Sequence, residues 1–204
     1  ELNDPIIEIA ITPNRGDCLG VRGIARDLSA ASIGRMKPLD TSECKGVFNS
    51  PIRWELSPDA LETVPRVTGR YFRNVTNNSS PEWMARRLIN IGQRSISALV
   101  DITNYIIIDL GRPLHAFDAD KISGDTLFIR RANAGEKILA LNEKEYTCTT
   151  DMLVIGDRDG ADDIAGIMGG ERTGIRNNTK NLFLEIAIFD PISVATTGRT
   201  LNIN

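Results

Sequence analysis

Four polar side chains placed among apolar residues are the strongest candidates for chemistry in this 204-residue chain: Thr103, Asn104, His115 and Glu185. His115 is the only histidine. Thr103 and Asn104 interrupt one apolar run, and Glu185 interrupts another. An unpartnered buried polar group costs about 1–3 kcal/mol, so each of these side chains needs a partner inside the protein or in a ligand. For Thr103 and Asn104 we favour internal hydrogen bonds over the lining of a pocket.

Glu185 lies in the segment Leu182–Phe189, which alternates as a strand does. Successive side chains of a strand point to opposite faces, so Glu185 shares a face with Phe183, Ala187 and Phe189. That face is expected to be buried. A buried carboxylate needs a partner or a shifted pKa, and such groups are enriched in functional sites.

The residues before His115 predict how it is presented. Residues 100–110 are almost wholly apolar, which indicates a buried helix. Gly111 is expected to end this helix in the left-handed region, and Pro113 prevents the helix from restarting. His115 then lies on a short extended run.

Residues 165–170 form a glycine-dense segment that includes Gly166 and Gly169. It is not a phosphate-binding P-loop, because no Gly-Lys-Ser/Thr follows. Two interpretations stay open: a strand that ends in a tight turn, or a wall where a ligand lies against backbone. Asp190 followed by Pro191 predicts the start of a helix that runs to about residue 199.

The first part of the chain predicts a strand at residues 6–11, a turn, and a helix at about residues 19–31. Asp17 can cap that helix. The polar residues 14–17 could bind a ligand, but capping with a local salt bridge is the interpretation we favour. Residues 34–52 have no regular pattern, which predicts a connecting segment.

A second helix is expected after a strand at residues 68–75, with Ser80 as its N-cap, Pro81 in the first position and Gly92 at its end. Three arginines make this the most basic neighbourhood of the chain: Arg86, Arg87 and Arg94. A solvated helix face is the default interpretation, and contact with RNA phosphates is the alternative.

The pattern changes from helical to β near residue 120. The strands expected there are 126–132, a hairpin of 137–141 with 145–148, and a pair at 152–155 and 164–168. The loop at residues 156–160 superficially resembles a calcium loop, but Met168 stands where the bidentate carboxylate is needed, which excludes calcium. We expect one module with a helix-rich part, residues 1–120, and a β-rich part, residues 121–204.

Composition limits the classes of function. At 41% hydrophobic and 25% charged residues the chain is an ordinary globular protein, and no apolar run approaches the ~20 residues of a membrane span. The formal charge of −3 differs from the basic charge of most free-standing nucleic-acid binders. The three cysteines form no CxxC pair, so no zinc site is expected. We expect free thiols in a reducing cytosol instead. The start at Glu1 and the end at Asn204 indicate an excised domain.

Four sequence blocks carry a resemblance to a known family: ITPNRGDCLGVRGIARDL, VDITNYIIIDLGRPLHAFD, AGIMGGE and NLFLEIAIFDP. With these blocks the chain resembles the editing module of the bacterial phenylalanyl-tRNA synthetase β subunit. The resemblance implies an α/β fold of unusual topology, with a β-sandwich-like core and helices around it. It implies hydrolysis of tyrosine mis-attached to the acceptor end of phenylalanine tRNA in a cytoplasmic α2β2 enzyme. It implies no cofactor in this module, because ATP and magnesium belong to a separate synthetic site.

The resemblance also assigns roles to residues. His115 matches the editing histidine, Thr103 and Asn104 match a threonine–asparagine pair, and Glu185 matches the residue that reads the tyrosine hydroxyl. Two glycines, Gly166 and Gly169, match those that shape the amino-acid pocket. Thr173 stands where the family usually has serine. The family continues into a further run that forms one wall of the pocket, so we expect catalysis to need more than residues 1–204.

The implied chemistry needs no covalent nucleophile, since the substrate is an activated ester, and the chain has no Gly-x-Ser-x-Gly elbow or Cys–His pair. A positioned water could suffice, with His115 orienting the water or the terminal ribose. Two rival readings remain: a non-catalytic tRNA-docking and assembly module of the same subunit, and an unrelated small-molecule binding domain. An assay for deacylation of mischarged tRNA separates the editing hypothesis from both of these alternatives.

Overall fold

The computed structural model describes residues 5–203, and the chain forms two compact units, each built from two stretches of sequence. The helical unit comprises Glu1–Asn49 with Asn78–Leu114, and the β-rich unit comprises Ser50–Asn77 with His115–Asn204. Each unit is described by itself below. No described helix combines the length and the apolar composition needed to cross a membrane.

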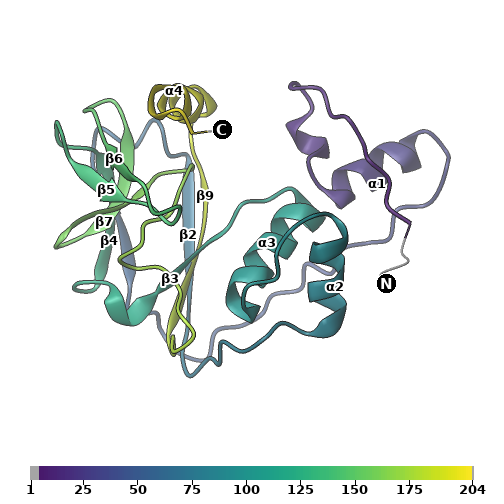
Figure 1. Cartoon of the computed structure of the whole chain (residues 1–204), viewed down its shortest axis with the longest axis horizontal. Coiled ribbons are helices and arrows are strands. Elements are labelled where there is room, and N and C mark those ends of the chain that lie inside the picture. The colour runs from purple at the N-terminus through teal and green to yellow at the C-terminus, as the bar shows by residue number, and fades with distance from the viewer. Residues whose placement is uncertain (1–4, 204) are drawn as a thin grey trace. The chain divides into compact units, whose positions relative to one another are not determined.

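The helical unit holds a short 3-10 helix and three α-helices: η1 Gly16–Cys18, α1 Val21–Ala30, α2 Glu82–Asn90 and α3 Ala98–Leu110. Helix α3 contacts both α1 and α2, and Figure 1 shows α2 beside α3. The start of α1 packs closely on the end of α3, because a Cβ at Gly20 would lie 2.3 Å from the backbone nitrogen of Gly111.

Helix α3 ends as predicted, with Gly111 in the left-handed region at φ 66° and its N–H donating to Ile107. The expectation of a buried helix is confirmed only in part. The buried residues of α3 are Leu99, Asp101 and Thr103, whereas Ile102 remains 40% exposed. Helices α1 and α2 cover only part of the apolar surface of α3 within this unit.

Other expected features of the helical unit are wrong. Residues 6–11 form no strand, and residues 6–10 are exposed, because an alternating pattern without a pairing partner does not build a sheet. Ser80 does not cap α2, whose N-cap is Pro81. The Ser80 hydroxyl instead donates to the fully buried carboxylate of Asp101, which also accepts from the N–H of Ile96 at 2.8 Å. Asp101 thus ties α3 to the chain before it.

The strands of the β-rich unit are β1 Arg53–Leu56, β2 Arg66–Phe72, β3 His115–Asp118, β4 Thr126–Arg131, β5 Lys137–Leu139, β6 Glu145–Thr147, β7 Leu153–Asp157, β8 Gly160–Ile164 and β9 Leu182–Ile188. They form three sheets, in the orders β1-β4-β7-β8, β2-β9-β3 and β5-β6. The unit also contains η2 Ala119–Lys121 and α4 Pro191–Leu201. The fold is therefore mixed α/β, as predicted, and the described strands close no barrel.

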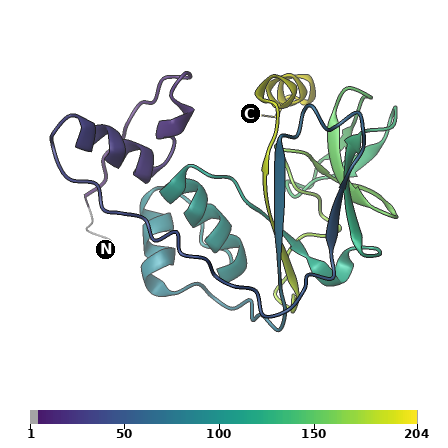
Figure 2. The ribbon, with the colours of Figure 1, turned by 180° about the vertical axis from the view of Figure 1, so that it is seen from behind.

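Strand β1 was not expected, and it changes the division of the chain. It pairs in parallel with β4, while β2 pairs antiparallel with β9. Both strands lie before residue 120, yet Figure 2 shows them, in dark blue, within the sheets of the β-rich unit. The boundary suggested at residue 120 therefore differs from the observed one, because these pairings join distant parts of the sequence.

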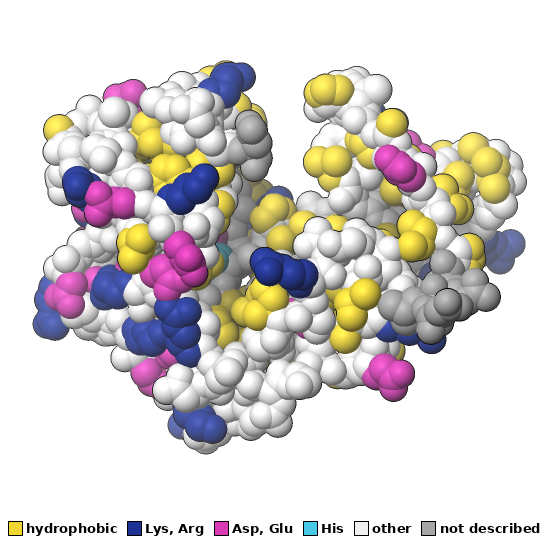
Figure 3. Space-filling model, viewed as in Figure 1, with side chains coloured by type: hydrophobic (Ala, Val, Ile, Leu, Met, Phe, Trp, Pro, Cys, Tyr) yellow, Lys and Arg dark blue, Asp and Glu magenta, His cyan; other side chains and the backbone are white. Residues whose placement is uncertain are grey.

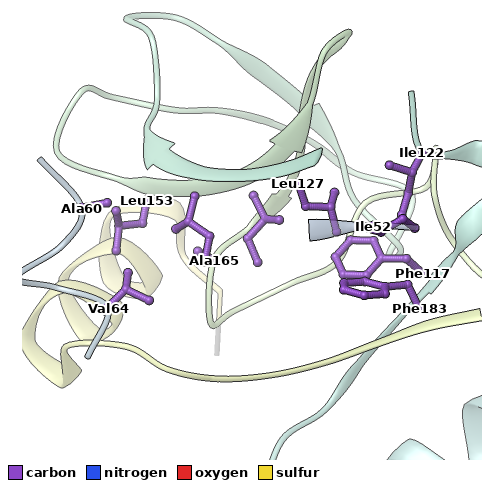
Figure 4. Packing of buried hydrophobic residues seen from close by; sticks show 11 residues of the cluster. Ile52, Ala60, Val64, Phe117, Ile122, Leu127, Leu153, Ala165 and Phe183 are labelled. Carbon is purple, nitrogen blue, oxygen red and sulfur yellow. The ribbon is translucent and has the colours of Figure 1, made fainter. Parts of the chain in front are cut away.

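Apolar side chains from the two larger sheets enclose one core, which gives the sandwich-like arrangement that was expected. Phe117 of β3 and Phe183 of β9 lie near Leu127 of β4, and Leu153 of β7 lies further along the same cluster (Figure 4). Ala165, which follows β8, joins the same cluster. Since β3 and β9 also carry His115 and Glu185, this core fixes where those polar residues lie.

Several local predictions for the β-rich unit are confirmed and one is wrong. The β5–β6 hairpin and strand β9 form where expected, and Asp190 caps α4 by accepting from the N–H of Ser193 at 2.7 Å. The strand expected at residues 164–168 is wrong, because the pairing with β7 uses residues 160–164. Beyond Ile164 the chain turns, with the N–H of Met168 donating to the Ile164 carbonyl.

Gly69→Ala is expected to lower the free energy of unfolding by about 1–3 kcal/mol, the usual range for an overpacked core. A Cβ at Gly69 would lie 2.1 Å from the Phe183 ring and 2.8 Å from the indole nitrogen of Trp54. Denaturant unfolding measures the change. Gly34→Ala is the control, because a Cβ there meets nothing within 4 Å. Equal effects of the two substitutions would contradict the prediction.

Candidate active site

Strand pairing brings His115 and Glu185 together. His115, the first residue of β3, lies directly opposite Glu185 in the antiparallel pair with β9. Opposed side chains of such a pair share a face, with Cβ atoms about 4.5–5.5 Å apart. On its other side Glu185 pairs with Gly69 of β2, which has no side chain. Glu185 is 6% exposed and the His115 side chain 21% exposed, so the pair lies at the edge of the core.

The imidazole of His115 is held between two rigid neighbours. The ring of Phe117 meets it edge-on, with centroids 4.5 Å apart. Gly169 lies so close that a Cβ there would be 2.2 Å from Cε1 of the imidazole. The group that lies against the backbone at Gly169 is thus a side chain of the protein itself, and the interpretation of the glycine-dense segment as a wall for a ligand stays a prediction. Gly166, at φ 73°, forms the turn before it and packs against Phe189.

Asp163 of β8 is a further member of this site that the sequence interpretation missed. One of its carboxylate oxygens lies 3.4 Å from Nε2 of His115, and the other accepts from the N–H of Gly170 at 2.7 Å. Asp163 is 3% exposed. A signal was present, because two consecutive acids precede Ile164 in a segment that is otherwise largely apolar, but the strand was placed at residues 164–168.

Burial governs the protonation of these groups. It lowers the pKa of His115, with the charge of Glu185 acting in the opposite direction. It raises the pKa of Asp163 to about 7, although the N–H of Gly170 and the charge of Arg172 act to lower it. Near neutral pH the imidazole is therefore neutral, and the Asp163 carboxyl is close to its midpoint. A neutral imidazole can both donate and accept a hydrogen bond.

The neighbouring acid, Asp162, has a different partner. It accepts from Nε of Arg172 at 2.7 Å, and the same guanidinium lies 2.7 Å from a carboxylate oxygen of Asp157. Burial raises the pKa of Asp162 to about 7 despite this cation. Asp157 also accepts from the N–H of Asp159 at 2.9 Å. The loop that superficially resembles a calcium loop is thus held by an arginine.

Thr103 and Asn104 belong to α3 in the helical unit. The Thr103 hydroxyl donates to the Val100 carbonyl at 2.7 Å, so the internal hydrogen bond favoured for this residue is confirmed. Asn104 is partly exposed. That these two residues line one cavity with His115 and Glu185 stays a prediction.

One group of potential metal ligands occurs among the described residues: Asp17, Cys18 and Asp27, whose ligand atoms lie within 4.8 Å of one another. Arg15 and Arg26 make ion pairs with both carboxylates, and these cations disfavour a bound metal ion. The local salt bridge predicted for residues 14–17 is therefore confirmed. The predicted capping by Asp17 is wrong, because the N-cap of α1 is Gly20.

Comparison with known proteins identifies the family. Residues 63–204 match the model of the B3/4 domain, a segment that contains His115, Asp163, Gly169 and Glu185. The chain belongs to the B3/4 domain family. Similarity to individual relatives covers the whole chain and so extends beyond residues 63–204 of the family model.

Curated relatives of this B3/4 domain are phenylalanine–tRNA ligase β subunits. The chain is 50% identical to that of Gluconobacter oxydans over 204 residues, covering 100% of the chain and 24% of the relative. It is 52% identical to that of Ruegeria pomeroyi over 98% of the chain and 25% of the relative. The chain thus spans about a quarter of the length of these relatives.

A solved structure shares the fold. An N-terminal fragment of the phenylalanyl-tRNA synthetase β subunit from Pyrococcus horikoshii matches with a TM-score of 0.51 and 18% identity, covering 87% of this chain and 54% of that one. At this identity the match supports the architecture of the B3/4 domain and no more.

Asp163→Asn is expected to stabilise the B3/4 domain relative to wild type at pH 8 and to lose this advantage at pH 5. The folded-state pKa of Asp163, about 7, lies above the ordinary value of about 3.9. Stability that the protonated carboxyl contributes in the wild type is therefore lost as pH rises through 7. The side-chain amide of the Asp163→Asn variant stays neutral over this range and loses nothing. The charged or titratable groups around it are His115, Asp162 and Arg172.

Free energies of unfolding of both proteins at the two pH values measure this effect. A difference between variant and wild type that does not grow from pH 5 to pH 8 would contradict the buried, proton-binding state of Asp163.

Proposed function

We propose that this B3/4 domain is the editing module of a phenylalanine–tRNA ligase β subunit and hydrolyses tyrosine from mischarged phenylalanine tRNA. One observation carries the proposal: His115 and Glu185, far apart in sequence, are cross-strand neighbours, and Gly169 lies against the histidine ring. The names of the relatives, phenylalanine–tRNA ligase β subunits, give the substrate class. ATP and magnesium act elsewhere in the parent enzyme, and this module needs neither.

Editing compensates for the weak discrimination between phenylalanine and tyrosine at the synthetic site. A pocket that buries phenylalanine cannot strongly reject tyrosine, since an added hydroxyl is discriminated by only about 10²-fold in a comparable case. A second site that requires the hydroxyl removes the error. In this proposal the buried carboxylate of Glu185 accepts a hydrogen bond from the phenol, worth about 1.5–3 kcal/mol for a charged acceptor. Phenylalanine leaves that interaction unmade.

The hydrolytic step transfers the acyl group from the terminal ribose to water. The ester is already activated, so positioning of the water and of the ribose is the main task. The neutral imidazole of His115 can orient either one, with Thr103 and Asn104 proposed to complete the site. Gly166 and Gly169 are proposed to shape the space for the amino acid. The partners are the tRNA acceptor end and the α subunit of a cytoplasmic α2β2 assembly.

A second candidate function is a non-catalytic tRNA-docking and assembly module. Large apolar side chains are exposed on the helical unit, where yellow groups gather in Figure 3, and such surfaces mark contacts with other macromolecules. Among them are Ile7, Leu19, Val47, Trp83 and Ile96. Deacylation by the full-length enzyme decides between the two, because a docking module leaves tyrosyl-tRNA intact.

Glu185→Ala is expected to slow hydrolysis of the tyrosyl ester by about 10- to 150-fold, if 1.5–3 kcal/mol is lost from the transition state. The preference for tyrosyl over phenylalanyl ester falls with it, because the group that reads the hydroxyl is gone. Glu185→Gln keeps the shape and one acceptor and is expected to fall between. Deacylation of both esters by the full-length enzyme is the measurement. If Glu185→Ala slows both esters equally, Glu185 does not read the hydroxyl.

His115→Ala is expected to slow removal of tyrosine from tRNA while phenylalanine charging continues, because charging takes place at another site of the parent enzyme. Parallel deacylation and aminoacylation assays of the complete enzyme test this. Equal losses in both assays would instead make His115 a folding residue, as its packing on Phe117 would allow.

A further inference from the structure

We infer that Asp163 is a positioning residue for His115: its carboxylate fixes which ring nitrogen carries the proton and directs the other toward the substrate. The inference deepens the proposed function and rests on it. It comes from the placement of Asp163 on β8, in the sheet that faces the one carrying β3 and β9.

The geometry around Nε2 of His115 points to this role. Nε2 is buried and makes no hydrogen bond within the described residues. The atom placed to receive its proton is a carboxylate oxygen of Asp163, at 3.4 Å. An ordinary N–H···O bond measures about 2.7–3.2 Å, and catalytic hydrogen bonds often tighten only when the substrate is bound. To complete this bond the imidazole and the carboxylate must move closer together and into line.

The consequence concerns the tautomer. When the Asp163 carboxyl is ionised, Nε2–H can donate to it, and Nδ1 then keeps a lone pair and is the acceptor of the ring. That lone pair can accept from the attacking water or from a ribose hydroxyl. The second nitrogen of a histidine commonly sets its tautomer through such a partner, and a carboxylate that holds a histidine in this way need not take up the proton itself.

Asp163 also has a structural bond, which makes a sharp substitution possible. Its other carboxylate oxygen accepts from the N–H of Gly170. In Asp163→Asn the side-chain oxygen can keep that bond, which leaves the amide NH2 group facing Nε2 of His115. Two donors cannot face each other, so the ring must change tautomer, with the proton moving to Nδ1. The loop that carries Gly169 keeps its tie throughout.

Asp162 provides a matched control. It is the same residue type on the same strand, equally buried at 2% exposure against 3% for Asp163. Its carboxylate is held by Arg172, whereas that of Asp163 lies against His115. Asp162→Asn therefore removes a buried carboxylate from β8 whose partner is Arg172 and not His115.

The first measurement is the imidazole ¹⁵N spectrum of the 204-residue chain, in which His115 is the only histidine. Protonated and unprotonated ring nitrogens have well-separated shifts. At about pH 9, above the pKa of Asp163, we expect the Nε2–H tautomer in wild type and in Asp162→Asn, and the Nδ1–H tautomer in Asp163→Asn. The same tautomer in all three proteins would overturn the inference, independently of any activity.

The second measurement is deacylation of tyrosyl-tRNA by the full-length enzyme. Asp163→Asn is expected to lower kcat by about 10-fold or more, in the range seen when a group that orients a histidine is removed, with KM for the tRNA little changed. In the His115→Ala background the same substitution is expected to change kcat by less than about 2-fold, because the two residues act together. Asp162→Asn is expected to lower kcat far less than Asp163→Asn.

The outcomes separate the two proposals. Wild-type enzyme that fails to deacylate tyrosyl-tRNA overturns the proposed function. Wild-type activity that depends on His115 but not on Asp163 overturns the inference alone, as does an Asp163→Asn effect of equal size in the His115→Ala background. If a variant of the isolated chain does not fold, the full-length comparison of single and double variants decides.

Discussion

The position of β9 between β2 and β3 is the constraint on which the candidate site depends. Phe183, fully buried between the sheets, fixes which face of β9 points inward. A slip of one residue in either pairing would turn every side chain to the opposite face. Burial of an aromatic ring thus sets the register that places Glu185 opposite His115 and beside Gly69. The apolar core and the polar site are two consequences of one pairing.

Strands β8 and β9 carry three buried carboxylates, Asp162, Asp163 and Glu185, an arrangement that opposes folding unless each charge finds a partner. The structure meets this requirement in separate ways. Asp162 is neutralised by Arg172, whereas Asp163 depends on one backbone N–H and on the histidine. Glu185 acts on His115 through its charge. Because two of these acids have pKa values near 7, the protonation of the site and the stability of the unit depend on the same pH range.

Features set by neighbours in sequence could be predicted, and features set by distant pairing could not. Gly111 ends α3 and Asp190 starts α4 through bonds to residues a few positions away. Strand β1 carries no local signal, because its partner is β4 much later in the chain. Residues 6–11 show the converse error, an alternating pattern that finds no partner strand.

The same distinction applies to the site. Glu185 could be singled out from the residues, because a lone acid in an alternating apolar strand is conspicuous. His115 could be singled out as the only histidine. Asp163 gave a weaker signal, two consecutive acids before Ile164, but its place beside His115 comes from the packing of one sheet on another and not from any spacing along the chain. Its strand had also been placed four residues too late, which left this acid in a presumed loop.

The two acids approach the imidazole from different sheets, and this has a consequence for how the site can be perturbed. Glu185 is held by strand pairing within one sheet, but Asp163 reaches His115 only because the facing sheet packs at the right separation. Phe117 connects the core to the site, because its ring contacts the imidazole of His115 and also belongs to the core between the sheets. Protein interiors are close-packed and transmit strain. The distance between Asp163 and His115 is therefore set by core side chains that need never touch a substrate, so core packing and the chemistry of the histidine are coupled.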